Sequence, residues 1–150
     1  MGADGDLKQD SKAARIERIA VRHLDRPGAL LPILHDVQAA FGHVPRAAVP
    51  VIAHLLNLSR AEVHGVITFY HDFRETPPQR PIVKLCRAEA CQARGVDRLV
   101  EPLERDPRIT VESVYCLGLC ASGPAAMIGD RVFGRLDEAG LPLLALEAVR

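Results

Sequence analysis

Tryptophan is absent from this sequence of 150 residues, and aromatic residues make up only 4% of it. Stacking platforms for nucleic-acid bases are therefore not expected. Net charge is absent too, because 19 basic residues balance 19 acidic ones, so we expect neither nucleic acid nor an anionic membrane as a partner. No apolar run approaches the ~20 residues of a membrane span, so we expect no direct membrane insertion.

The first ten residues, MGADGDLKQD, lack the apolar run behind a basic patch that marks a secretory signal. Their three aspartates also argue against a mitochondrial transit peptide. We therefore expect a cytoplasmic protein. Cysteines stay reduced in that compartment, so the four cysteines of this chain indicate metal or redox chemistry before structural disulfides.

The chain divides by pattern into a polar flexible tail (1–10), a helical domain (11–75), a connector (76–80) and a second domain (81–150). In the helical domain, Leu30, Leu34, Val37 and Phe41 share one helical face. The segment 59–62 (SRAE) has the pattern of a capping box and predicts a short helix ending near residue 65. The connector contains Thr76-Pro77-Pro78, which is stiff and non-helical.

The second domain alternates between strand and helix patterns. We predict strands over 81–86 and 109–115, a helix over 90–104, a hairpin over 125–133 and a closing helix. The hairpin is indicated by Gly129-Asp130, a typical two-residue turn. The predicted fold class is therefore α+β, with a helical bundle followed by a small domain of mixed strands and helices.

The cysteines form two pairs, Cys86 with Cys91 and Cys116 with Cys120, separated by 24 residues. Cys86 and Cys116 each end a predicted strand, so both pairs are expected at one edge of a sheet. The wide spacing within each pair suits a [2Fe–2S] cluster, which needs two ligands per iron. Structural zinc, dithiol exchange and inert buried thiols remain open as alternatives, although zinc and dithiol sites favour a C-x2-C spacing.

Other residues bear on the choice between a [2Fe–2S] cluster and these alternatives. An oxidised cluster with four thiolates carries a charge of about −2, which Arg87 or Arg94 would offset unless these arginines are only solvated. Gly118, Ser122 and Gly123 permit tight backbone turns around the sulfurs. The six histidines show no ligand spacing. The aromatic segment 69–73 either anchors a partner or packs within the protein.

Three stretches resemble a known family, the thioredoxin-like [2Fe–2S] subunits of NAD-linked oxidoreductases. They are PGALLPILHDVQ (27–38), VITFYHDF (66–73) and the two cysteine pairs, the second standing in CLGLC (116–120). The resemblance implies a thioredoxin-like [2Fe–2S] ferredoxin domain in which Cys86, Cys91, Cys116 and Cys120 bind one cluster. It implies no catalytic residue in this chain, and it places FMN and NAD on a partner flavoprotein subunit.

The short spacer between the cysteine pairs is most similar to the gamma subunit of NAD-dependent molybdenum formate dehydrogenases. That resemblance implies a non-catalytic electron-transfer subunit of a soluble formate dehydrogenase, with a larger molybdenum and iron–sulfur catalytic subunit as a further partner. The equivalent subunit of NADH:quinone oxidoreductase (complex I) or of an NAD-reducing hydrogenase is the alternative. A zinc-stabilised interaction module is the alternative from another class.

Overall fold

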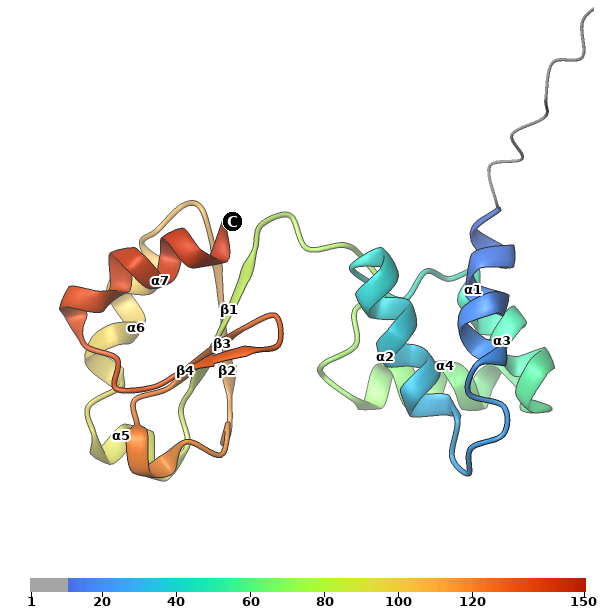
Figure 1. Ribbon diagram of the computed structural model, residues 1–150, viewed down its shortest axis with the longest axis horizontal. Helices are drawn as coiled ribbons and strands as arrows, with labels where there is room; N and C mark the ends of the chain where they lie inside the picture. The colour runs from blue at the N-terminus through green and yellow to red at the C-terminus, as the bar shows by residue number, and fades with distance from the viewer. Residues whose placement is uncertain (1–10) are drawn as a thin grey trace, which may run out of the picture. The chain divides into compact units, whose positions relative to one another are not determined.

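A computed structural model describes residues 11–150, which form two compact units that meet in sequence between Pro77 and Pro78 (Figure 1). The predicted tail over 1–10 lies outside the described residues. Helices make up the first unit, and helices with a four-stranded sheet make up the second. These contents confirm the predicted α+β class. Among the described residues, no helix is long and apolar enough to cross a lipid bilayer.

Four helices make up the first unit. They are α1 (Lys12–Val21), α2 (Leu30–Phe41), α3 (Ala48–Leu56) and α4 (Arg60–Phe69). Pro32 and Pro50 lie in the first turns of α2 and α3, where a missing amide hydrogen costs little. The capping box before α4 is present, because Ser59 accepts from the amide of Glu62 and the Glu62 carboxylate accepts from the amide of Ser59.

The prediction that the helix after the capping box ends near residue 65 is wrong. Helix α4 continues through Gly65 to Phe69, and the amide of Tyr70 still bonds to the carbonyl of Val66. Val63 and Ile67 are both buried on one face of α4, so tertiary packing outweighs the low helix propensity of glycine.

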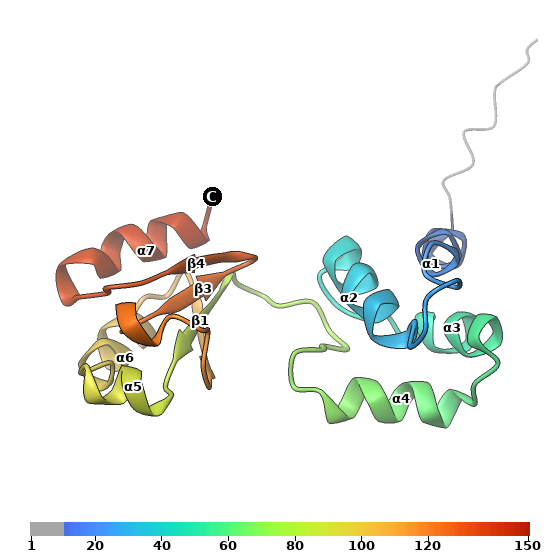
Figure 2. The same cartoon turned by 60° about the horizontal axis from the view of Figure 1, so that its bottom comes forward.

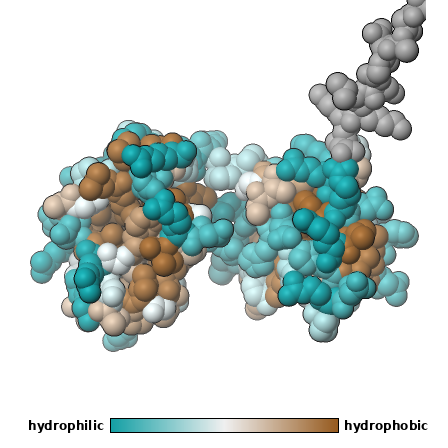
Figure 3. Space-filling model, in the orientation of Figure 1, coloured by the Kyte–Doolittle hydropathy of each residue, from teal (hydrophilic) through white to brown (hydrophobic). Residues whose placement is uncertain are grey.

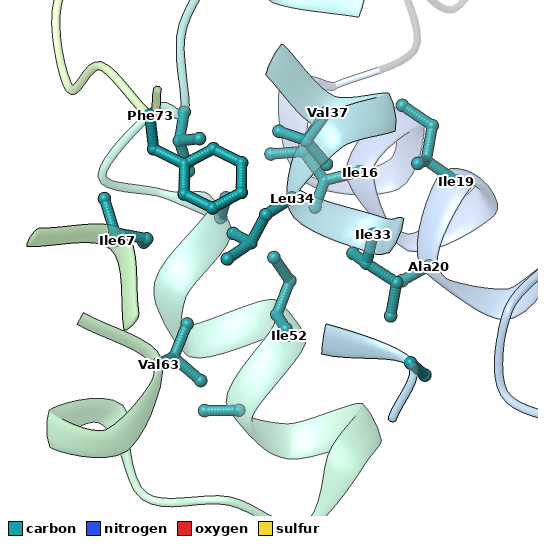
Figure 4. Packing of buried hydrophobic residues seen from close by; sticks show 14 residues of the cluster. Ile16, Ile19, Ala20, Ile33, Leu34, Val37, Ile52, Val63, Ile67 and Phe73 are labelled. Atoms are coloured by element: carbon teal, nitrogen blue, oxygen red, sulfur yellow. The ribbon is translucent and has the colours of Figure 1, made fainter. Parts of the chain in front are cut away.

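One apolar cluster holds the first unit together (Figure 4). Its fully buried side chains come from all four helices and include Ile16, Leu34, Ile52 and Val63. Phe73, which follows α4, closes the cluster and is also buried. On the helical face predicted from the sequence, Leu34 and Val37 are core residues, whereas Leu30 and Phe41 are half-buried and pack against the core.

The second unit contains a sheet with strand order β2-β1-β3-β4. Its elements are β1 (Ile82–Cys86), α5 (Glu89–Ala93), α6 (Asp97–Glu104), β2 (Thr110–Val114), η1 (Cys120–Ser122), β3 (Ala126–Ile128), β4 (Arg131–Phe133), η2 (Glu138–Gly140) and α7 (Leu141–Ala148). Strands β1 and β2 are parallel, whereas β3 is antiparallel to both β1 and β4. The predicted hairpin is present, with Gly129 in a left-handed conformation at its turn.

Helices α6 and α7 contact each other beside the sheet, as the views in Figures 1 and 2 show. Leu99 of α6 and Leu144 of α7 share one apolar core with Val83 and Leu85 of β1. Because side chains alternate along a strand, Val83 and Leu85 point to the same face of the sheet. This packing fixes the position of the carboxyl end of β1.

The helix predicted over 90–104 is divided into α5 and α6. Gly95 breaks it, because its φ of +84° is a conformation that glycine adopts without steric cost. The amide of Val96 then bonds to the carbonyl of Cys91 at 3.0 Å, which closes α5. The break sets the direction of the short helix that carries Cys91.

Candidate metal centre

The four cysteines lie on two segments at one edge of the sheet. Cys86 is the last residue of β1 and Cys91 lies in α5, whereas Cys116 follows β2 and Cys120 begins η1. Because β1 and β2 are parallel and Cys86 is in register with Val114, their carboxyl ends deliver both segments to the same place. The structure thus brings together the four cysteines that the sequence singles out.

The two pairs differ in exposure. Cys86 and Cys91 are buried with 2% of their surface exposed, whereas Cys116 and Cys120 are exposed. None of the four is in a disulfide. The site therefore has one pair of thiols in the apolar core and one pair at the surface.

The sulfur atoms of Cys116 and Cys120 lie 3.7 Å apart. Two thiolates on one tetrahedral metal, at metal–sulfur distances of about 2.3 Å, lie about 3.8 Å apart. The exposed pair therefore has the spacing of two ligands that share one metal ion. Cys86 and Cys91 are also close enough for each thiol to shift the pKa of the other.

The backbone at Cys116 is in an unusual conformation, with a φ of +83°. Side chains with a Cβ rarely adopt this conformation, which costs of order 1–3 kcal/mol and is concentrated at functional sites. Two residues later Gly118 has a φ of +77°, and its amide donates to the sulfur of Cys116 at 3.4 Å. The CLGLC segment is thus folded around the sulfur it presents.

Backbone amides also surround the sulfur of Cys86. Burial raises the pKa of this thiol, but hydrogen bonds from the amides of Ala88, Cys116 and Leu117 and from the thiol of Cys91 outweigh burial and lower the pKa overall. These donors favour the thiolate, which is the form that binds metals.

The two other shifted thiols move in the opposite direction. Burial, followed by the neighbouring thiols of Cys86 and Cys120, raises the pKa of Cys91. The hydrogen bond and the charge of Cys116 raise the pKa of Cys120. The four groups therefore act on one another electrostatically, and a bound cation would relieve the repulsion between their thiolates.

A close backbone contact supports the loop after Cys120. A Cβ placed on Gly123 would lie 3.2 Å from the Sγ atom of Cys91, so only glycine leaves that sulfur unobstructed. Gly134, at the end of the hairpin, lies against the same loop, since a Cβ there would lie 2.8 Å from the carbonyl oxygen of Ser122. The hairpin thus closes one side of the site.

Two arginines flank the site. Arg87 directly follows Cys86, and its Nη2 atom donates to Asp97 at 2.9 Å. The Nε atom of Arg87 is buried and has no hydrogen-bond partner in the described chain. The side chain of Arg94 reaches Gly123, where a Cβ would lie 3.2 Å from its Cδ atom. Both placements fit the expectation that these arginines lie near the cysteines.

The donor set consists of two pairs of thiols. Within residues 11–150, no three cysteine, histidine or carboxylate side chains gather around a point that could hold a single ion. Two pairs of soft sulfur ligands and a surrounding set of amide donors are the features that a [2Fe–2S] cluster uses. The four thiolates could therefore hold such a cluster, with one pair on each iron.

Three of the histidines contact carboxylates in the helical unit. His23 lies 2.8 Å from Asp36, and longer contacts join His35 to Asp72 and His64 to Glu75. They lie outside the unit that carries the cysteines. All six histidines of the sequence belong to the helical unit.

The aromatic segment divides into buried and exposed members. Phe73 is buried in the core of the helical unit, whereas 74% of the surface of Phe69 is exposed. Tyr115, next to Cys116, is exposed to a similar degree. Apolar areas also reach the surface of each unit in Figure 3. Packing within the helical unit therefore accounts for Phe73 but not for Phe69.

Sequence reasoning missed the backbone groups that support the centre. The amides of Ala88 and Leu117 have no side-chain signature, and neither does the contact between Gly134 and Ser122. The sequence did offer one indication of this contact, the glycine at position 134. An isolated glycine at the end of a strand often marks the close approach of another backbone segment.

Three subunits of known oxidoreductases have sequences similar to that of this chain. The E 2 subunit of NADH-quinone oxidoreductase from Rhizobium meliloti is 34% identical, and the alignment covers 90% of this chain and 86% of the relative. The E subunit of the Pseudomonas aeruginosa enzyme is 31% identical, with coverages of 97% and 93%. The HndA subunit of the NADP-reducing hydrogenase of Solidesulfovibrio fructosivorans is 28% identical, with coverages of 74% and 71%.

A solved structure of an NAD+-reducing [NiFe]-hydrogenase in its air-oxidised state is also similar, with a TM-score of 0.66 and 28% identity. The match covers 85% of this chain but only 24% of the hydrogenase chain, so the whole hydrogenase chain is far longer than the shared part. Residues 16–147 match the thioredoxin-like [2Fe-2S] ferredoxin family, which carries one [2Fe–2S] cluster. The chain belongs to the thioredoxin-like [2Fe–2S] ferredoxin family.

Proposed function

We propose that this chain is the [2Fe–2S] electron-transfer subunit of a complex related to NADH-quinone oxidoreductase, and that Cys86, Cys91, Cys116 and Cys120 bind its cluster. The observation that carries the proposal is the convergence of two thiol pairs at the carboxyl ends of β1 and β2. Membership of a [2Fe–2S] family supports it.

In this proposal each iron is held by one pair of cysteines. Cys116 and Cys120 hold the outer iron, which their sulfur separation of 3.7 Å supports. Cys86 and Cys91 hold the inner iron, which their shared burial and their effect on each other's pKa support. The cluster supplies storage of one electron at a time, and the amides around Cys86 stabilise the negative charge that this storage adds.

The partner is a flavoprotein subunit that holds FMN and NAD. This chain exchanges single electrons with the FMN and has no catalytic residue of its own. Support comes from the relatives, whose names describe oxidoreductases that use NADH, NADP or NAD+. The exposed pair, Cys116 and Cys120, is the part of the site that a partner can approach.

A complex of the NADH-quinone oxidoreductase type is favoured because two relatives from such enzymes match over 86% and 93% of their own length. A subunit of an NAD-reducing or NADP-reducing hydrogenase is the second candidate, which the HndA and [NiFe]-hydrogenase matches favour. The formate dehydrogenase assignment, with its molybdenum subunit, rests only on the spacer of 24 residues and stays a prediction.

Anaerobic purification from the native host tests the proposal. We expect a brown protein with two irons and two sulfides per chain and a spin one-half EPR signal after reduction. A colourless protein with one zinc would contradict the cluster and support the interaction module. The chains that co-purify identify the complex, since quinone reductase, hydrogenase and molybdenum subunits differ in size and metal content.

A further inference from the structure

Arg94 lies closer to the cysteine site than its position at the end of α5 suggests. A Cβ placed on Gly123 would lie 3.2 Å from the Cδ atom of Arg94 and 3.2 Å from the Sγ atom of Cys91. The methylene group and the sulfur are therefore at most twice that distance apart. The absence of a side chain at Gly123 is what allows the arm of Arg94 to lie across the loop.

The guanidinium of Arg94 makes no direct ion pair in the described chain. No carboxylate of residues 11–150 forms an ion pair with it, although Asp137 and Glu138 line the same surface cleft of about 360 Å³. Arg87, by comparison, is held by Asp97 at 2.9 Å. Arg94 therefore carries its charge without a direct ion pair, on a side chain whose Cδ atom lies near the sulfur of Cys91.

Arg98 provides an internal comparison. It lines the same cleft, is likewise exposed and also has no ion-pair partner among the described residues. It is not among the atoms nearest to Gly123, however, and its Nε atom lies beside Gly95 instead. The two arginines thus share their surroundings but differ in their approach to Cys91.

We propose, on the basis of the function proposed above, that Arg94 balances the charge of the cluster and raises its reduction potential. Reduction adds one electron to a cluster of charge about −2, with no bond made or broken and no proton required. A positive charge at the end of this side chain, whose Cδ atom lies near the Cys91 sulfur, stabilises the reduced state more than the oxidised state. Because the guanidinium is exposed, dissolved salt will weaken its effect.

The test compares three variants of the full chain with its cluster: Arg94→Met, Arg94→Lys and Arg98→Met. Methionine keeps a flexible arm over Gly123 and removes the charge, whereas lysine keeps both. The measurement is the midpoint potential, from titration with dithionite and redox mediators followed by EPR, at low and high salt.

We expect a potential more negative than wild type in Arg94→Met, a smaller shift in Arg98→Met and a wild-type potential in Arg94→Lys. The shift in Arg94→Met should shrink at high salt. Equal shifts at positions 94 and 98, or a lysine variant that shifts as far as the methionine variant, would overturn the role of Arg94 while leaving the cluster in place.

Two further outcomes are decisive. If Arg94→Met assembles no cluster, Arg94→Lys decides: an intact cluster with the wild-type potential supports the charge role, and a lost or shifted cluster overturns it. If the wild-type chain itself contains neither iron nor sulfide, the proposed function fails, and the inference about Arg94 fails with it.

Discussion

The amide of Arg135 donates to the carbonyl oxygen of Ser122 at 2.6 Å, which joins the end of the β3–β4 hairpin to the loop after Cys120. Gly134 precedes this bond and lies against the same carbonyl. The hairpin contributes no cysteine, yet it determines where the loop with Cys120 can lie. The contact therefore connects the stability of the second unit to the geometry of its thiols.

Substitution Gly134→Ala tests this connection. The new Cβ would lie 2.8 Å from the Ser122 oxygen, so the loop or the hairpin must move. Strain of this kind typically costs about 1–3 kcal/mol. We expect a lower free energy of unfolding in urea and a lower iron content after purification.

Gly65→Ala is the matched control. Gly65 lies inside α4 and has no neighbouring atom within 4 Å of an added Cβ. Alanine there should stabilise the helix by up to about 1 kcal/mol and leave the iron content unchanged. Iron loss in both variants, or in neither, would show that the hairpin contact does not support the site.

Removal of one proposed ligand provides a second prediction. Cys116→Ser should abolish the cluster, because a serine oxygen replaces one of the four sulfur ligands. The helical unit should keep its helix content, because its core contains no residue of the cysteine loops. Iron and sulfide assays with far-UV circular dichroism measure the two effects.

The neighbouring Tyr115→Phe variant is the control for that experiment. Tyr115 is 75% exposed, so loss of its hydroxyl should leave both the cluster and the fold unchanged. Unchanged iron and sulfide in Cys116→Ser would exclude Cys116 as a ligand.

The capping box of α4 provides a third prediction. Ser59→Ala removes the acceptor for the Glu62 amide, which lies 3.1 Å away, and should destabilise the helical unit by about 1 kcal/mol. Thermal unfolding by circular dichroism measures the loss. Thr68→Ala is the comparison, because within residues 11–150 the Thr68 hydroxyl bonds only to carbonyls of its own helix. A larger loss at Thr68 than at Ser59 would contradict the role of the box.

The fourth prediction concerns pH. Hydrogen bonds and charge from Arg108 lower the pKa of Asp106 from 3.8 to about 2. A carboxyl whose folded pKa is lowered stabilises the protein above its unfolded pKa, and this contribution is lost as the pH falls through about 2.

Asp106→Asn should therefore be less stable than wild type at pH 7, and the difference should decrease as the pH falls from the unfolded pKa of 3.8 toward about 2. Urea unfolding at several pH values measures it. A constant difference across this range would mean that the Arg108 contacts do not set the effect.

The sequence was sufficient to predict that the two cysteine pairs meet at one edge of the sheet, because the cysteine spacing and the strand ends are local features. Cys86 and Cys116 meet because β1 and β2 are parallel neighbours, which the alternation of strand and helix patterns implies. The break at Gly95 was missed because a single glycine within an apolar periodicity does not by itself end a helix.

The close contacts of Gly123 and Gly134 could not be predicted from the sequence, for another reason. Gly123 is suited to its place only because Arg94 and Cys91 approach it from another segment, and the pairing of Gly134 with Ser122 depends on the sheet order. Such contacts arise after the elements pack. No pattern within either segment specifies them.

The two thiol pairs differ in burial, so the site has one side within the protein and one side at its surface. Cys86 and Cys91 are enclosed by the core, and only Cys116 and Cys120 reach the surface. If each pair holds one iron, the two irons are inequivalent before any electron arrives, since one faces protein and the other faces water or a docked partner. Electron exchange with another protein then has a single side of entry, defined by the CLGLC segment.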